Sequence, residues 1–294
     1  PQDYSILFLQ GGASLEFLMV PFNLMKINGN ASYLNTGVWS RKAIQEAKDF
    51  GKVSIIGDSS DKNFNYIPKN YEIPNNIDYF HCTSNNTIYG TQIKNFPICK
   101  THLVCDMSSD IFSRKIDVRK FGLIYAGAQK NMGPAGTTLV IVKNEILGKT
   151  NRKIPTMLNY QTHINGKSMF NTPPVFPIYV SMLTLKWIKE QGGVSVIEKR
   201  NIKKAKLLYS EIDRNSLFTG TALSEDRSLM NICFLLNDES KKDMFDKMCE
   251  DAGINGIKGH RSVGGYRASV YNAMPIESIK VLVDLMRTLE KKLK

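Results

Sequence analysis

Through the first two thirds of the chain, short apolar runs alternate with segments of helical pattern, and this alternation constrains the fold most. A helix between successive strands favours an α/β sheet whose strands are largely parallel. We expect Ser14 to cap the first of these helices. The predicted strands lie at 5–10, 31–35, 52–56, 79–83, 102–106, 122–125 and 137–142, with helices at 14–25 and 40–50.

The last third of the chain has longer helical segments. Pro173 and Pro174 can open a helix that runs to about 191, because proline is tolerated in a first helical turn, and Gly192-Gly193 then stops it. Further helices are expected at 194–215, at 240–252 and from 275, with strands near 231–236 and 268–271. We therefore predict a large domain at 1–192 and a small α+β domain at 193–294.

Composition excludes some classes of protein. The net charge is +12, but many of the lysines lie in amphipathic helical stretches and no nucleic-acid motif appears, so we expect no nucleic-acid partner. The five cysteines and four histidines lack metal-ligand spacing, which favours free thiols in a reducing cytosol and no metal. No apolar run is long enough to cross a bilayer and no secretory leader is present, so we expect a cytoplasmic protein without a membrane partner.

Two features suggest ligand binding at the edge of the predicted sheet. Residues 10–14 (QGGAS) form a glycine turn before a helix, where free backbone N–H groups suit a phosphate, although such a turn is also common without a ligand. Asp106 ends an apolar strand at the edge where α/β sheets bind ligands. A capping or turn role for Asp106 is the alternative.

Two further features carry charged side chains. Lys130 follows a strand and has small neighbours, which is typical of a half-buried amine that acts as a nucleophile, although an ordinary loop lysine is the alternative. The glycine-rich run 259–269 contains His260, Arg261 and Arg267, and an arginine can bind a carboxylate through two parallel hydrogen bonds. A solvated basic loop is the other interpretation.

These features occur together in an order that resembles a known family. DMSSD at 106–110 followed by GAQKN at 127–131 is similar to the pyridoxal-phosphate site of class V aminotransferases. More narrowly, the chain resembles the phosphoserine aminotransferases from about residue 6 to the C-terminal helix. The segments that carry this resemblance are GASLEF at 12–17, TSNNTI at 83–88, GHRSVGG at 259–265 and RASVYNAMP at 267–275.

The resemblance implies a fold, a cofactor and an activity. The fold would be that of the fold type I pyridoxal-phosphate-dependent transferases, and the reaction a reversible amino transfer between L-glutamate and 3-phosphooxypyruvate, giving O-phospho-L-serine and 2-oxoglutarate. Lys130 would bind pyridoxal 5'-phosphate and shuttle the α-proton, while Asp106 would pair with the pyridine nitrogen. Trp39 would stack on the ring, although from the residues alone it reads as a core aromatic.

The remaining roles also follow from the resemblance. Thr87 and Gln129 would hydrogen-bond the cofactor, with Ala13 and Ser14 at its phosphate. Asn171 and Thr172 would reach the cofactor of a neighbouring subunit, which implies a homodimer with shared active sites. His260, Arg261 and Arg267 would bind the substrate's phosphate and carboxylate.

Two departures from the family and two rival functions remain. Some members carry arginine where this chain has Ser14, and members begin upstream with a segment that adds a substrate-site His-Arg pair. Because this chain begins at Pro1, close to a predicted strand, we expect that its natural N-terminus is missing. The rivals are another class V enzyme, such as an alanine–glyoxylate aminotransferase or a cysteine desulfurase, and a binding protein or truncated form with impaired catalysis.

Overall fold

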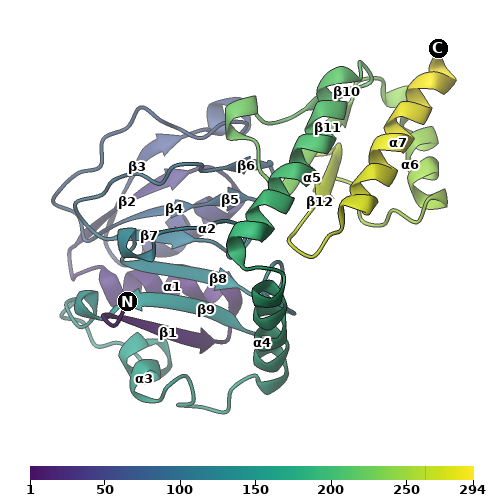
Figure 1. Cartoon of the computed structure of the whole chain (residues 1–294). Coiled ribbons are helices and arrows are strands. Elements are labelled where there is room, and N and C mark those ends of the chain that lie inside the picture. The colour runs from purple at the N-terminus through teal and green to yellow at the C-terminus, as the bar shows by residue number, and fades with distance from the viewer. Residues whose placement is uncertain (262) are drawn as a thin grey trace.

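The fold was obtained as a computed structural model that describes residues 1–261 and 263–294. It contains a seven-stranded sheet, a three-stranded sheet and a two-stranded ribbon (Figure 1). The strands are β1 (Tyr4–Leu9), β2 (Asn30–Asn35), β3 (Lys52–Asp58), β4 (Tyr79–Thr83), β5 (Asn85–Asn86), β6 (Thr91–Gln92), β7 (Leu103–Asp106), β8 (Leu123–Gly127), β9 (Thr138–Lys143), β10 (Phe218–Gly220), β11 (Asn231–Leu236) and β12 (Tyr266–Ser269). The helices are α1 (Gly12–Leu24), α2 (Val38–Ala47), α3 (Tyr160–Asn165), α4 (Val175–Glu190), α5 (Val194–Arg214), α6 (Lys242–Asp251) and α7 (Ile276–Leu293).

The seven-stranded sheet has the order β1-β9-β8-β7-β4-β2-β3 and is mainly parallel. Strands β3, β2, β4, β7 and β8 are parallel to one another, whereas β9 is antiparallel to both β8 and β1. This arrangement confirms the predicted α/β class, because the structure has helices between parallel strands.

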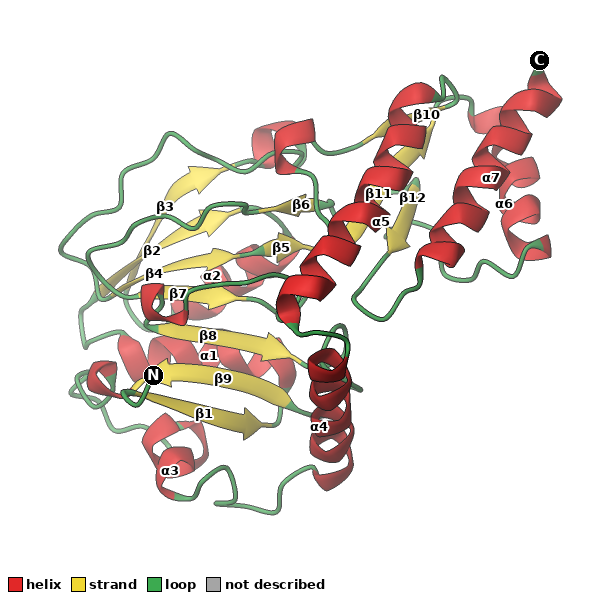
Figure 2. Cartoon of the chain, viewed as in Figure 1, coloured by secondary structure: helices red, strands yellow, loops and turns green. Residues whose placement is uncertain are grey.

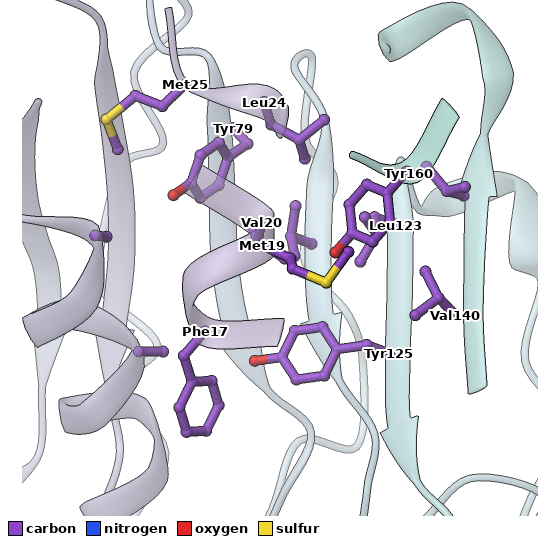
Figure 3. Packing of buried hydrophobic residues seen from close by; sticks show 14 of the residues in the cluster. Phe17, Met19, Val20, Leu24, Met25, Tyr79, Leu123, Tyr125, Val140 and Tyr160 are labelled. Carbon is purple, nitrogen blue, oxygen red and sulfur yellow. The ribbon is translucent and has the colours of Figure 1, made fainter. Parts of the chain in front are cut away.

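Helices α1 and α2 cover one face of the large sheet (Figure 2). The apolar face of α1 packs on strand residues, with Phe17 and Val20 beside Tyr125 and Val140 (Figure 3). The strands also carry apolar residues on the opposite face, where a second buried cluster includes Phe80. Because both faces are buried, the central strands read as nearly continuous apolar runs in the sequence.

The three-stranded sheet β10-β11-β12 is antiparallel and lies beside α5, α6 and α7. Its buried cluster is formed by the sheet together with these three helices. Gly192-Gly193, where the domain boundary was placed, lies between α4 and α5. The division into two domains at that point stays a prediction.

Three expectations about single elements need correction. Strand β12 begins and ends two residues earlier than 268–271, and beyond its end the carbonyls of Val270, Tyr271 and Met274 accept hydrogen bonds from the buried Lys204 ammonium. Helix α3 and strand β10 were not predicted, since each is short. Helix α1 begins at Gly12, so Ser14 lies in its first turn and does not cap it.

Candidate active site

The residues predicted to bind a ligand gather at one edge of the seven-stranded sheet. Strand β1 runs in the same direction as β8, because both are antiparallel to β9, so β1, β2, β4, β7 and β8 all end at this edge. Open α/β sheets bind ligands beyond the carboxyl ends of their strands. The glycine turn follows β1, Trp39 follows β2, Thr87 follows β4 and β5, Asp106 ends β7 and Lys130 follows β8.

Asp106 is buried, with 4% of the residue exposed. Its Oδ1 accepts a hydrogen bond from the Ser108 hydroxyl at 2.6 Å and another from the Ser108 backbone N–H at 2.9 Å. Burial raises the pKa of Asp106 above the ordinary aspartate value, while the two Ser108 hydrogen bonds and the charge of Lys130 oppose that rise. The carboxylate is thus held in one orientation, away from water.

Lys130 lies in a tight turn after β8. The Ala128 carbonyl accepts the backbone N–H groups of Lys130, Met132 and Gly133, which closes this turn. At the end of the side chain, Lys130 Nζ donates a hydrogen bond to Thr87 Oγ1 at 2.7 Å. The turn and this bond together direct the amine toward the segment that follows β4.

The environment of Lys130 favours its neutral amine. Burial is the main cause that lowers the pKa of Lys130 below the usual lysine value. The positive charge of Arg267 adds to this effect, and the negative charge of Asp106 opposes it. Because the neutral amine is the nucleophilic form, a lowered pKa favours reaction of Lys130 with a carbonyl group.

The glycine turn before α1 requires glycine for a steric reason. Gly11 has φ +91°, and a Cβ added there would lie 2.5 Å from the Leu15 Cβ. Gly12, at φ +65°, has open space where a side chain would be. Ala13 and Ser14 follow in the first turn of α1, whose backbone N–H groups lack partners within the helix. This end of α1 can therefore bind an anion.

Trp39 and Gln129 lie at the same sheet edge with different exposure. Trp39 is half-buried against the core under the sheet, so it is only in part the core aromatic that the residues alone suggest. Its indole Nε1 is buried and has no hydrogen-bond partner in the part of the chain that the structure describes. Gln129 is exposed, and its side chain folds back toward Gly127, where an added Cβ would meet Gln129 Oε1 at 2.6 Å.

The basic residues of the loop before β12 and of β12 itself differ in their exposure to solvent. Arg261 is exposed, and His260 is partly buried. Arg267 is partly buried on β12, and its Nε has no hydrogen-bond partner within residues 1–261 and 263–294. The positive charge of Arg267 helps to lower the pKa of Lys130, so Arg267 lies near Lys130 and Asp106. Arg261 lies at the surface.

Asn171 and Thr172 lie apart from this group in the sequence and are both exposed. The Thr172 carbonyl accepts hydrogen bonds from Gln10 Nε2 at 3.1 Å and from Asn171 Nδ2 at 3.3 Å. Gln10 directly precedes the glycine turn. The segment is therefore joined to the start of that turn within the same chain.

Two polar residues at the site were missed from the sequence. Ser108 binds Asp106, and a serine two residues after an aspartate is a common turn pattern that could have indicated it. Asn131, next to Lys130, accepts a hydrogen bond from the Asn272 backbone N–H at 3.0 Å and so joins the two sheets. No local signal marks that contact, because the two residues are 141 positions apart.

Comparison with known proteins agrees with this geometry. The sequence model of the family described as aminotransferase class-V matches residues 1–282. A phosphoserine aminotransferase of Flavobacterium psychrophilum is 66% identical over 99% of this chain and 82% of that relative. The phosphoserine aminotransferase structure from Bacillus circulans subsp. alkalophilus has a TM-score of 0.96 at 44% identity, covering 100% of this chain and 82% of the other.

A third relative is a solved structure described as bound to pyridoxal phosphate. It is the phosphoserine aminotransferase of Trichomonas vaginalis, with a TM-score of 0.91 at 36% identity over 98% of this chain and 83% of that one. Over the described residues, no helix is both long enough and apolar enough to cross a membrane. The family match, the identity to these relatives and the shared fold lead to one conclusion. This chain belongs to the phosphoserine aminotransferases, within the pyridoxal-phosphate-dependent class-V aminotransferase family.

Proposed function

We propose that the protein transfers an amino group reversibly between L-glutamate and 3-phosphooxypyruvate, giving 2-oxoglutarate and O-phospho-L-serine for serine biosynthesis. The observation that carries this proposal is the pair of Asp106 and Lys130. They lie at or just beyond the ends of the neighbouring strands β7 and β8, and each acts on the pKa of the other. A buried acid beside a half-buried amine is typical of a catalytic site.

The residues at the sheet edge fit pyridoxal phosphate. When bound, this cofactor supplies a ring that withdraws electrons from the α-carbon of the substrate. Lys130 would hold the cofactor and would move the proton at that α-carbon, and the lowered pKa of its amine supports this role. Asp106 would keep a proton on the pyridine nitrogen, and its buried, hydrogen-bonded carboxylate supports this role.

The remaining contacts with the cofactor come from its surroundings. The half-buried ring of Trp39, at the sheet edge after β2, supports stacking on the cofactor. The first turn of α1, with Ala13 and Ser14, offers N–H groups to the cofactor phosphate. Thr87 and Gln129 complete the set as hydrogen-bonding residues, and Thr87 already contacts Lys130.

The loop at 259–267 supplies the grip on anionic substrates. Arg267 is the residue for the shared α-carboxylate, because its Nε is buried without a partner and its charge reaches Lys130. Arg261 is exposed and can bind the substrate's phosphate, with His260 beside it in the same loop. Guanidinium groups match both anions through paired hydrogen bonds.

The active form is a homodimer with shared sites, and an apolar surface on α4 supports this assembly. Val175, Phe176, Tyr179 and Met182 are all exposed on this helix, and Phe176 is 71% exposed. They continue toward Ile6 of β1, Met169 and Phe170, and a groove of about 650 Å³ runs between α4 and β1. Apolar patches of this kind commonly mark protein interfaces.

The same interface gives Asn171 and Thr172 their role. Both are exposed directly before α4, which suits contact with the cofactor phosphate of the partner subunit. Replacement of Phe176 by glutamate should shift the protein from dimer to monomer in analytical ultracentrifugation. Replacement of Ile98, which is 93% exposed far from α4 in the sequence, by glutamate is the control that should stay dimeric. A dimeric Phe176→Glu variant would place the interface elsewhere.

The rival functions differ in what their sites need. A cysteine desulfurase requires an accessible catalytic thiol, whereas Cys82, Cys105, Cys233 and Cys249 are buried and Cys99 is partly buried. All five thiols are free, which supports a reducing compartment such as the cytoplasm. A binding protein without catalysis would have no use for the Lys130 and Asp106 pair.

One assay tests the proposed reaction against these rivals. The protein loaded with pyridoxal phosphate is given O-phospho-L-serine and 2-oxoglutarate, and glutamate formation is measured. Alanine with glyoxylate and free cysteine serve as parallel donors. We expect fast turnover with phosphoserine and only slow exchange with alanine. Preferred alanine–glyoxylate exchange, or release of sulfide from cysteine, would support the other class V enzymes.

A further inference from the structure

One hydroxyl lies between the two strand ends that carry Asp106 and Lys130. The Ser108 Oγ donates a hydrogen bond to Asp106 Oδ1 at 2.6 Å. The same oxygen accepts a hydrogen bond from the Gly127 backbone N–H at 3.1 Å. Ser108 is buried, so the two bonds do not compete with bulk water.

The first bond determines how the carboxylate is presented. Asp106 Oδ1 receives both the hydroxyl and the backbone N–H of Ser108. This double anchor leaves Oδ2 as the oxygen that can face a ligand. It also counteracts the cost of burying a charge, because hydrogen bonds to the charged form lower the pKa of Asp106.

The second bond fixes where the Lys130 turn begins. Gly127 is the last residue of β8, and the turn closed by the Ala128 carbonyl follows it at once. If Gly127 moved relative to β7, Lys130 would move with it. The Ser108 hydroxyl therefore sets the position of one reactive group against the other.

The neighbouring Ser109 provides an internal comparison. It is also buried, and its hydroxyl likewise makes two hydrogen bonds, donating to the Asn85 carbonyl at 2.7 Å and accepting from Asn85 Nδ2 at 2.8 Å. Those bonds lead to β5 and not to Asp106 or Gly127. The two serines thus match in burial and bonding but differ in what they hold.

We propose that Ser108 is a positioning residue for the amino transfer. Its single hydroxyl fixes the position of the Asp106 carboxylate relative to the start of the Lys130 turn. This inference rests on the proposed role of Asp106 at the cofactor. It adds a requirement of its own: removal of the hydroxyl takes away one of the two hydrogen bonds that orient the Asp106 carboxylate and favour its ionised form.

The test measures the carboxyl group of Asp106 directly in the cofactor-free protein. The chain is labelled with ¹³C-aspartate, the Asp106 signal is assigned from its absence in Asp106→Asn, and its titration is followed by NMR. We expect Ser108→Ala to raise the pKa of Asp106 by about one pH unit, since one hydrogen bond to the charged form is lost. Ser109→Ala is the matched control and should leave that pKa unchanged.

Two further measurements complete the test. The dissociation constant of pyridoxal phosphate should rise in Ser108→Ala, because the Asp106 carboxylate loses one of the two hydrogen bonds that orient it, and should stay unchanged in Ser109→Ala. If Ser108→Ala fails to melt cooperatively, Ser108→Cys keeps the size with a weaker donor and should raise the pKa of Asp106 by a smaller amount. Equal Asp106 titrations in the Ser108 variants and the parent would overturn the proposal. This titration needs no cofactor, so it is independent of whether the proposed reaction is correct.

Discussion

The two halves of the proposed active site are built in different ways. On the proposed cofactor side, Thr87 and Asp106 are buried at the edge of the seven-stranded sheet, and hydrogen bonds fix both Asp106 and Lys130. On the proposed substrate side, His260 and Arg261 lie in a glycine-rich loop, and Arg261 is exposed. The sheet edge thus fixes the orientations of Asp106 and Lys130 before any ligand binds, whereas the loop offers basic side chains to an anionic ligand.

This difference separates two kinds of mutational effect. A buried group whose pKa is shifted by its surroundings acts on the chemical step, so its loss should lower kcat. A partly exposed arginine contributes binding energy, so its loss should mainly raise KM. The substitutions below probe this division, from the largest expected effect to the smallest.

Lys130 should show the largest effect. Lys130→Ala removes the amine, and Lys130→Arg replaces it with a group that stays protonated, so both should lose at least about 10³-fold in kcat. Stopped assays of glutamate formation, with circular dichroism to confirm folding, measure this loss. Turnover near the parent rate in either variant would remove Lys130 from the mechanism.

Asp106→Asn should follow, with a loss of roughly 10²- to 10³-fold in kcat and retained cofactor. The amide fills the same space but cannot hold a proton on the pyridine nitrogen. Steady-state kinetics together with cofactor content by absorbance distinguish lost chemistry from lost binding. A variant with the parent rate would mean that Asp106 is structural.

Arg267→Lys tests the substrate side. An ammonium cannot reproduce the paired hydrogen bonds of a guanidinium, so KM should rise about 10- to 100-fold for glutamate and phosphoserine alike while kcat changes less. Arg261→Lys is the companion variant and should affect phosphoserine only. If Arg267→Lys weakened phosphoserine alone, Arg267 would belong at the phosphate.

Glu16 should show the smallest effect, and on stability instead of rate. It is fully buried under the sheet edge, where burial raises its pKa to about 8 and Tyr160 donates a hydrogen bond to it at 2.5 Å. Because folding raises the pKa of Glu16, the free energy of unfolding falls as the pH rises from 4.5, the pKa of the side chain in the unfolded chain, toward 8.

Glu16→Gln should therefore remove that part of the pH dependence. At pH 7 we expect a gain of only about 1 kcal/mol in the free energy of unfolding, because the buried amide brings an unpaired donor of its own. Urea denaturation at pH 5, 7 and 8 measures it. An unchanged pH slope between parent and variant would show that Glu16 ionises freely in the folded protein.

The sequence was a good guide to the strands that position Asp106 and Lys130. Asp106 and Lys130 could be proposed because each follows an apolar strand, and strand ends are visible in a linear pattern. The orientation of Asp106 by Ser108 needed coordinates, since many serines follow an aspartate without binding it.

Contacts between distant segments were harder to foresee. Lys204 binds the carbonyls that follow β12, some 66 to 70 residues away, and no local pattern indicates a buried lysine within an amphipathic helix. The sequence predicted the helix in the run 173–191 but not the exposed apolar face of α4. Its exposure became visible once the sheet beneath it was placed.

The central claim is that Lys130 alone binds the cofactor covalently, and peptide mapping tests it directly. The protein loaded with pyridoxal phosphate is reduced with borohydride, digested and analysed by mass spectrometry to find which lysine keeps the reduced cofactor. The account predicts one modified residue, Lys130, and no such label in Lys130→Arg. A stable label on another lysine, or an unlabelled Lys130 in protein that transfers amino groups, would contradict it.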